Sequence, residues 1–315
     1  MVGISILDGT RKQRQAARAK AGSLRTLQLQ PATLKRYRGA VNFFFNWLEE
    51  VGEQLPSSVE ATDEILGEFL EECWAIGESR ALVGDTLSGI QHFLPQLRRG
   101  LNDAWRLYGT WCKNEVPSRA KPLLARQVLA MAGYALEEGD QSMAAGLLVA
   151  FNGFLRPCEA MLTSGQCTFD LDQGTCHINL GLTKGGKRAG IPEHVIIDDL
   201  EAVHLLAQVL AGRAKGKALF PRKTPGFRAS FKKLLGKIGA DPQRYKPYSL
   251  RRGGATHHWH VLGNLSRTTL RGRWRHQQTC RIYIQDGVAM LEQLRLSARE
   301  LKLIAKGCAL LRRLA

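Results

Sequence analysis

Long apolar runs are missing from this chain of 315 residues. No stretch approaches the ~20 consecutive apolar residues that a helix needs to cross a bilayer. The start of the chain also lacks an apolar segment followed by a small-residue cleavage site, which is the pattern of a secretory signal. We therefore expect an intracellular protein with no membrane partner, nuclear in a eukaryotic host and cytoplasmic in a bacterial one.

Cysteine is sparse and irregularly spaced. The seven cysteines are scattered, and no two of them form a CxxC pair. An odd, scattered set indicates neither a disulfide framework nor a zinc site. A reducing compartment fits this usage best.

Negative charge is in short supply. Asp and Glu total 28 against 45 Lys and Arg, which gives a formal net charge of +17. Such an excess creates a positive field that favours a polyanionic partner. Nucleic acid is the first candidate and an anionic membrane surface the second, and a basic protein with neither partner stays open.

The length exceeds the size at which one core usually keeps growing, so we expect two domains. The polar segment KNEVPSRAK at 113–121 is typical of an interdomain linker. The predicted units are an arm at 1–26, a helical domain at 27–113, a larger domain at 114–290 and a C-terminal helix at 291–315. The arm is expected to be flexible and solvated because its cations have few apolar residues between them: Arg11, Lys12, Arg14, Arg18, Lys20 and Arg25.

Residues 27–113 show helical periodicity. Apolar residues recur at steps of three and four from Pro31, which predicts an amphipathic helix whose aromatic stripe packs in a core. A second helix is expected to begin at Thr62 as its N-cap. Two more helices are predicted around 82–93 and 101–112, so this domain of about ninety residues is entirely helical.

The second domain changes its periodicity partway along. Helical patterns cover 123–135 and 142–155, and β-prone runs follow at 176–182 and 191–197, joined by the glycine-rich segment TKGGKRAG. Helical patterns resume from Leu200 to the end. The predicted fold is mainly α with a small antiparallel β-sheet.

Several cations stand in positions that suit phosphate chemistry. Arg156 follows an apolar helix in FLRPCEA, with Glu159 three residues later. The glycine-rich connection offers Lys184 and Lys187, and YSLRRGGAT places Arg251 near the start of a helix. Arginine binds phosphate oxygens through a planar fork that stays charged, although a single arginine after a helix is most often only a solvated charge.

Taken in order, these segments resemble the active-site boxes of the tyrosine recombinase (phage integrase) family. That family pattern is an arginine with an acidic residue three positions on, a hairpin lysine, His-x-x-Arg, a His or Trp, and a tyrosine. Here a tryptophan precedes the last tyrosine by nine residues, as in the family. The matching residues are Arg156, Glu159, Lys184, Arg251, Trp274 and Tyr283.

One position departs from the family pattern. Tyr248 stands where the family usually has the histidine of His-x-x-Arg. A phenol can donate a hydrogen bond, but its pKa near 10 makes it a poor base at neutral pH. We expect altered chemistry at this position, with partial compensation by His257, His258 or His260 as a weaker alternative.

The resemblance implies a mechanism that needs no metal or other cofactor. Tyr283 attacks a DNA phosphodiester, forms a 3′-phosphotyrosyl link and releases a 5′ hydroxyl. Arg156 and Arg251 bind the phosphate, Trp274 lies beside it, and Lys184 protonates the leaving oxygen. Glu159 orients or neutralises arginines, and a 5′ hydroxyl from another duplex then completes the strand exchange.

The resemblance also implies a two-domain clamp on double-stranded DNA. A helical core-binding domain and an integrase-like catalytic domain would form this clamp. Four protomers would assemble on DNA through the C-terminal helix, which would dock on the neighbouring protomer. The alternative is that this helix packs on its own domain. The alternatives are a catalytically weak, recombinase-derived DNA-binding protein, a type IB topoisomerase and a basic scaffold. The expected DNA-binding cations are Lys35, Arg36, Arg38, Lys187, Arg188 and Arg252.

Overall fold

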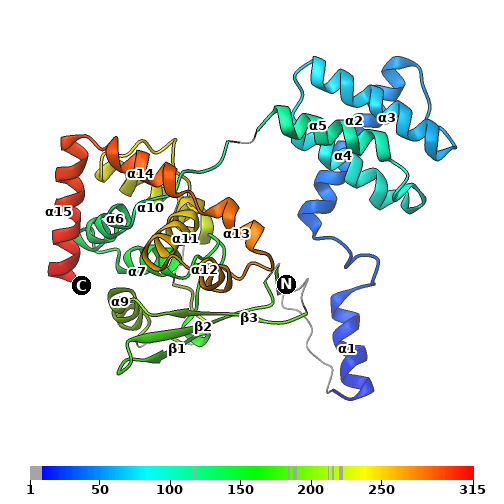
Figure 1. The fold of residues 1–315 in the computed structure, drawn as a ribbon. Helices are drawn as coiled ribbons and strands as arrows, with labels where there is room; N and C mark the ends of the chain where they lie inside the picture. The colour runs from blue at the N-terminus through cyan, green and yellow to red at the C-terminus, as the bar shows by residue number, and fades with distance from the viewer. Residues whose placement is uncertain are drawn as a thin grey trace. The chain divides into compact units, whose positions relative to one another are not determined.

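The computed structural model describes residues 9–116, 118–183, 185–186, 190–211, 213–214, 216–219 and 223–315. The described chain divides into two compact units, one up to Ser118 and one from Arg119 (Figure 1). This division falls inside the polar segment 113–121. Each unit is described by itself below.

The first unit is helical, as predicted. Its core is aromatic and aliphatic: Phe44 and Phe69 are both fully buried and meet edge to face at 5.1 Å. The expected aromatic stripe is therefore core packing. Its helices are α1 (Arg11–Ala21), α2 (Pro31–Val51), α3 (Val59–Ala75), α4 (Arg80–Phe93) and α5 (Asn102–Asn114), with a 3-10 turn at Pro95–Leu97.

The start of α3 differs from the prediction. The helix begins at Val59 because the Ser58 hydroxyl accepts a hydrogen bond from Ala61 N at 3.1 Å, so Ser58 is the N-cap. Thr62, the predicted cap, is buried in the first turn. Asp63 does not cap α3: its carboxylate accepts hydrogen bonds at 2.9 Å from the backbone amides of Asp103 and Ala104 in the first turn of α5.

Helix α1 lies where the charge pattern predicted a flexible arm. Thr10 and Gln13 form a capping box at its start, and its Ala, Arg, Lys and Gln residues have high helix propensity. None of its residues is buried, so local propensity rather than packing accounts for this helix.

The second unit combines helices with one small sheet, which confirms the predicted fold class. Strands β1 (Cys167–Asp170), β2 (Thr175–Gly181) and β3 (Glu193–Ile197) pair antiparallel in that order. The helices are α6 (Ala125–Glu137), α7 (Gln141–Asn152), α9 (Leu200–Leu210), α10 (Lys223–Lys237), α11 (Tyr248–Leu262), α12 (Leu265–Arg271), α13 (Gln277–Tyr283), α14 (Asp286–Leu294) and α15 (Ala298–Leu314).

The sheet lies along one side of the helices in Figure 1. Cys176 pairs with Ile197 and Ile178 with Val195, and all four side chains are buried on its inner face. The sequence pattern predicted β2 and β3 and missed β1. Strand β1 spans only four residues, too few to show a clear period-2 pattern.

The predicted C-terminal helix is divided in two. Arg295–Ser297 interrupts it, and Ser297 starts α15 with a capping box to Glu300. Helix α15 packs on α6 of its own chain, where a Cβ on Gly133 would lie 1.9 Å from the Gly307 oxygen. Among the described residues, no helix combines the length and apolar character needed to cross a membrane.

Candidate active site

A small apolar cluster separate from the main core surrounds the start of α11. Phe154, Ala255, Trp274 and Cys280 are buried in it, and Tyr283 packs against it. The glycine pair of RRGGAT makes the close packing possible: a Cβ on Gly254 would lie 2.0 Å from the Phe151 oxygen of α7. Helix α11 is therefore pressed against α7, which places both arginines that precede this pair inside the protein, and Arg251 is the more deeply buried of the two.

Arg251 is fully buried. Its Nη2 donates to the Gly272 oxygen at 2.8 Å, and its Nη1 donates to the Phe154 oxygen. No carboxylate in the described part of the chain forms an ion pair with it. Burial lowers the pKa of Arg251, but an arginine keeps its charge at neutral pH, so the site contains a buried positive charge without a direct counter-ion.

Aromatic rings hold this guanidinium beside the candidate nucleophile. Its Cζ lies 4.8 Å from the ring centroid of Trp274 and 5.3 Å from that of Tyr283, within the range of a cation–π interaction. Trp274 is buried, and its ring centroid is 4.6 Å from that of Tyr283. The structure thus brings together three of the residues that the sequence predicted.

Tyr283 ends α13 and shares a hydrogen bond with Tyr248 at the start of α11, with 2.5 Å between the two hydroxyl oxygens. Burial and this hydrogen bond raise the pKa of Tyr248 to about 12. Burial also raises the pKa of Tyr283, but the hydrogen bond from Tyr248 and the charge of Arg251 outweigh it, so the net shift is downward. Tyr283 therefore loses its proton first, and Tyr248 stays protonated as its donor.

Arg156 lies beyond the end of α7, where Phe154 turns the backbone with a positive φ of 46°. Glu159 accepts a hydrogen bond from the backbone amide of Arg156 at 2.8 Å and another from its guanidinium. Burial lowers the pKa of Arg156. The negative charges of Glu159 and, to a smaller extent, Glu193 raise it by more, so the net shift is upward. The side chain keeps 28% of its surface exposed, so it can still meet a ligand.

The other predicted cations have mixed outcomes. Lys184, Lys187 and Arg188 lie outside the described residues. Arg252 was expected to contact DNA, but it is buried, donates to the Ile282 oxygen at 3.2 Å and lies 5.4 Å from the Tyr283 ring centroid. The structure therefore places Arg252 inside the protein, against the ring of the candidate nucleophile.

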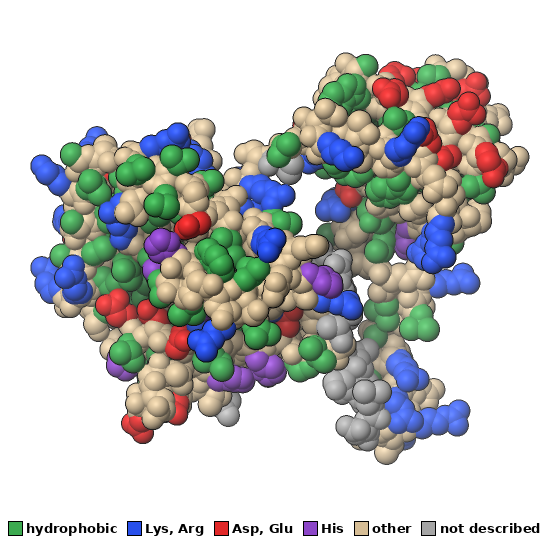
Figure 2. Space-filling view, in the orientation of Figure 1, with side chains coloured by type: hydrophobic (Ala, Val, Ile, Leu, Met, Phe, Trp, Pro, Cys, Tyr) green, Lys and Arg blue, Asp and Glu red, His purple; other side chains and the backbone are tan. Residues whose placement is uncertain are grey.

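The remaining predicted cations, Lys35, Arg36 and Arg38, are exposed on α2 of the first unit. Arg36 pairs with Asp85 at 3.0 Å. Figure 2 shows acidic side chains gathered on part of this unit, where α3 carries five exposed glutamates, and such a surface would repel a polyanion. The α3 glutamates are Glu60, Glu64, Glu68, Glu71 and Glu72.

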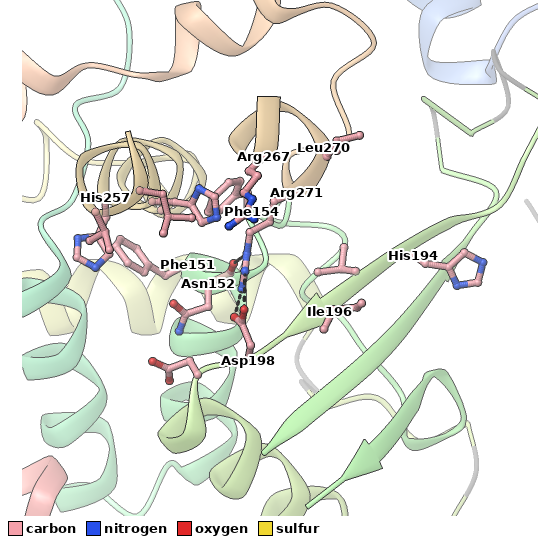
Figure 3. Close-up of a pocket in the computed structure, with 16 residues that line it drawn as sticks. Phe151, Asn152, Phe154, His194, Ile196, Asp198, His257, Arg267, Leu270 and Arg271 are labelled. Carbon is pink, nitrogen blue, oxygen red and sulfur yellow. Dashed lines mark hydrogen bonds and ion pairs between the residues drawn. The ribbon is translucent and has the colours of Figure 1, made fainter. Parts of the chain in front are cut away.

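The histidines of α11 do not join Tyr283. His257 and His258 line a groove of about 660 Å³ between α11, α12 and β3 (Figure 3). There Arg271 forms an ion pair with Asp198, and His258 Nδ1 lies 2.8 Å from Thr268 Oγ1. His260 Nδ1 lies 3.2 Å from Asp286 Oδ1. Within the described chain, no hydrogen bond links any of the three histidines to Tyr248 or Tyr283.

Sequence reasoning missed Arg273 and Glu193. Arg273 Nη2 donates to Glu159 Oε2 at 2.8 Å, and its Nε lies 3.4 Å from Glu193 Oε2. The only sequence signals are the position of Arg273 next to Trp274 and that of Glu193 at the start of a β-prone run. The described residues contain no group of three or more potential ligands that could hold a metal ion.

No family model and no curated protein sequence matches this chain. Solved structures do. The Tn1549 transposon integrase in complex with transposon right end DNA is 13% identical over 90% of this chain and 98% of that one, with a TM-score of 0.58. The XerH site-specific recombinase bound to palindromic difH substrate is 17% identical over 74% and 71%, with a TM-score of 0.53.

A further Tn1549 integrase complex, with circular intermediate DNA, is 14% identical over 84% of this chain and 99% of that one, with a TM-score of 0.55. All of these proteins are tyrosine recombinases. The chain therefore has the tyrosine recombinase fold. At these identities the likeness establishes the fold, and the chemistry is argued from the site.

Proposed function

We propose that this protein is a site-specific tyrosine recombinase that cuts and rejoins double-stranded DNA without a cofactor. The observation that carries the proposal is the 2.5 Å hydrogen bond between the Tyr283 and Tyr248 hydroxyls, beside the buried charge of Arg251, which forms no ion pair with a described residue. This combination favours a phenolate next to a site for phosphate oxygens.

The proposed reaction begins when Tyr283 gives up its hydroxyl proton to solvent and its phenolate oxygen attacks phosphorus. A bond forms between that oxygen and phosphorus, the bond to the 5′ oxygen breaks, and a proton is delivered to that oxygen. Arg251 and Arg156 stabilise the charge that builds on the non-bridging oxygens, because arginine donors act most strongly in a site shielded from water. Lys184 is the proposed acid, and a 5′ hydroxyl from a second duplex then reverses the first step.

The domain roles form part of the same proposal. Residues 27–113 would bind DNA as the core-binding domain, through Lys35, Arg36 and Arg38, and residues 114–290 would carry catalysis. Assembly of four protomers on DNA belongs to the proposal as an implication of the family resemblance. Action in integration or in the movement of a mobile element is supported by the similar structures named above, which are of a recombinase and a transposon integrase on DNA.

Covalent capture tests the proposal directly. Purified protein and the Tyr283→Phe variant are incubated with a duplex library that includes the DNA flanking the gene, and non-covalent DNA is then removed with denaturant. Tyr134→Phe is the matched control, since Tyr134 is a buried tyrosine whose hydroxyl binds the Leu303 oxygen on α15. We expect adducts with the wild type and the control and none with Tyr283→Phe.

One observation favours a second candidate function. Tyr248 cannot serve as a base with a pKa of about 12, so a weakly catalytic DNA-binding protein descended from recombinases is the alternative. Salt-sensitive DNA binding by the wild type without any adduct would contradict the recombinase proposal and support this alternative.

A further inference from the structure

Four charged side chains form a closed ring beside Tyr248 and Arg251, and we call it the charge ring: Arg156, Glu159, Arg273 and Glu193. Glu159 binds the backbone and guanidinium of Arg156 and accepts from Arg273 at 2.8 Å. Glu193 Oε2 lies 3.4 Å from Arg273 Nε and 3.9 Å from Arg156 Nη1. The charges alternate around the ring and sum to zero.

The members of the charge ring differ sharply in exposure. The side chains of Arg273, Glu159 and Glu193 are 7%, 8% and 11% exposed, whereas Arg156 is 28% exposed. Removing ions from water is costly unless opposite charges and hydrogen bonds replace the water. Three members whose side chains are largely shielded from solvent therefore hold one more accessible member, and that member is a predicted phosphate ligand.

Arg273 occupies its place under strain. Its φ is +56°, in the left-handed region that residues other than glycine rarely adopt. Its Nη1 and Nε are buried without a hydrogen-bond partner in the part of the chain that the structure describes. Burial lowers the pKa of Arg273 to about 10, so it is still charged at neutral pH. A strained backbone that buries a charged side chain indicates that the contacts of that side chain matter here.

We infer that Arg273 is a positioning residue for Arg156: it holds Glu159 and Glu193, and these carboxylates in turn fix the Arg156 guanidinium toward a DNA phosphate. The inference rests on the proposed function, because it assigns Arg156 a phosphate ligand. We assign Arg273 this indirect role because its Nη2 donates to Glu159 and its Nε faces Glu193, so its side chain is directed at the two carboxylates.

A double-mutant cycle between Arg156 and Arg273 tests whether one acts through the other. Arg156→Ala, Arg273→Met and the double variant are compared in adduct formation and in the salt dependence of duplex DNA binding. Arg273→Met alone should slow adduct formation about 10- to 100-fold, as loss of a residue that orients a ligand does. In the Arg156→Ala background it should change the rate less than about threefold, because coupled residues are not additive.

Binding gives a readout that does not need chemistry. Each single variant should reduce the slope of log affinity against log salt by about one, the amount expected for one lost phosphate contact, and so should the double variant. Full additivity, with the double variant losing about two, would overturn the inference. Arg271→Met is the matched control, because Arg271 belongs to the ion pair with Asp198 outside the ring and should leave both readouts unchanged.

Restoring charge balance separates positioning from folding. Arg273→Met leaves two carboxylates facing one arginine, and adding Glu193→Gln makes the remaining pair neutral again. The double variant Arg273→Met/Glu193→Gln should recover at least about tenfold of the lost rate if the excess negative charge displaces Arg156 or repels phosphate. No recovery, in proteins that unfold at the same urea concentration as the wild type, would count against the ring.

If the wild type binds DNA but forms no adduct, the recombinase proposal fails. The inference about Arg273 can still be tested, because the salt dependence of DNA binding in the four proteins of the double-mutant cycle does not require adduct formation.

Discussion

The two arginines predicted to bind phosphate are held in opposite ways. Arg251 is buried among aromatic rings and donates to backbone oxygens, whereas Arg156 belongs to the charge ring and is bound by carboxylates. The Arg251 pocket therefore carries a net positive charge. The charge ring carries none, because its two carboxylates balance its two arginines. The difference teaches that the field acting on Tyr283 comes mainly from Arg251, while Arg156 contributes donors in a defined direction.

The largest expected effect tests the pocket side of this comparison. Arg251→Lys keeps the charge but cannot bind the Phe154 and Gly272 oxygens together with one fork. We expect adduct formation to fall about 10²- to 10³-fold. Single-turnover rates of adduct formation provide the measurement.

The control for Arg251→Lys is Arg213→Lys. Arg213 also donates to backbone oxygens, those of Ala218 and Leu219, on a part of the unit away from Tyr283. Its substitution should leave the rate of adduct formation within about twofold of the wild type. Equal losses in the two variants would mean that Arg251 acts only through folding.

Tyr248→Phe tests whether the second tyrosine tunes the first. Loss of the donor destabilises the Tyr283 phenolate, so the pKa of Tyr283 rises and the half-maximal pH of adduct formation moves upward. A hydrogen bond to a charged group contributes about 1.5–3 kcal/mol, which corresponds to about 10- to 150-fold in rate near neutral pH. The pH–rate profile is the measurement. Tyr245→Phe is the control, because the Tyr245 hydroxyl donates to Glu292 and not to Tyr283.

An unchanged profile in Tyr248→Phe would show that the hydrogen bond does not affect the nucleophile. Rates that converge with those of the wild type at high pH would instead support the assigned direction, because Tyr283 is then deprotonated in both proteins.

The charge ring should respond more weakly when one carboxylate becomes an amide. Glu159→Gln keeps an acceptor for the Arg156 amide but removes the charge that Arg156 and Arg273 share, so we expect about a tenfold loss of rate. Glu292→Gln is the control, because Glu292 is likewise buried and pairs with Lys121 and Arg244. It should lower the free energy of unfolding without lowering the rate.

The smallest effect is expected at Gly185, in the segment that precedes β3. A Cβ on Gly185 would lie 2.4 Å from Glu193 Oε1, so Gly185→Ala must displace a ring carboxylate. We expect a loss of about two- to fivefold in rate, since the end of a side chain can move at moderate cost. Gly165→Ala is the control, because a Cβ on Gly165 would have no atom within 4 Å. Equal rates for the two variants would show that Gly185 does not affect the charge ring.

Much of the fold followed from local pattern. The 3.6-residue period of α2 and the period-2 runs of β2 and β3 depend on side chains a few positions apart, so they can be read along the chain. The order and spacing of Arg156, Arg251, Trp274 and Tyr283 suggested a recombinase-like site in the same way. Short or competing signals failed: β1 has four residues, and two cap-type residues compete at the start of α3.

The contacts that give the site its character depend on packing. The sequence predicted Arg252 to be a DNA-binding surface cation, but the packing of α11 against α7 buries it. The sequence assigned no partner to Tyr248, and the structure places Tyr283 of α13 beside it. Glu193 and Arg273 are 80 residues apart, and no spacing rule joins them. Local chemistry dictates helices, strands and candidate residues, whereas charge pairing and pKa shifts arise from distances that the chain sets only when it folds.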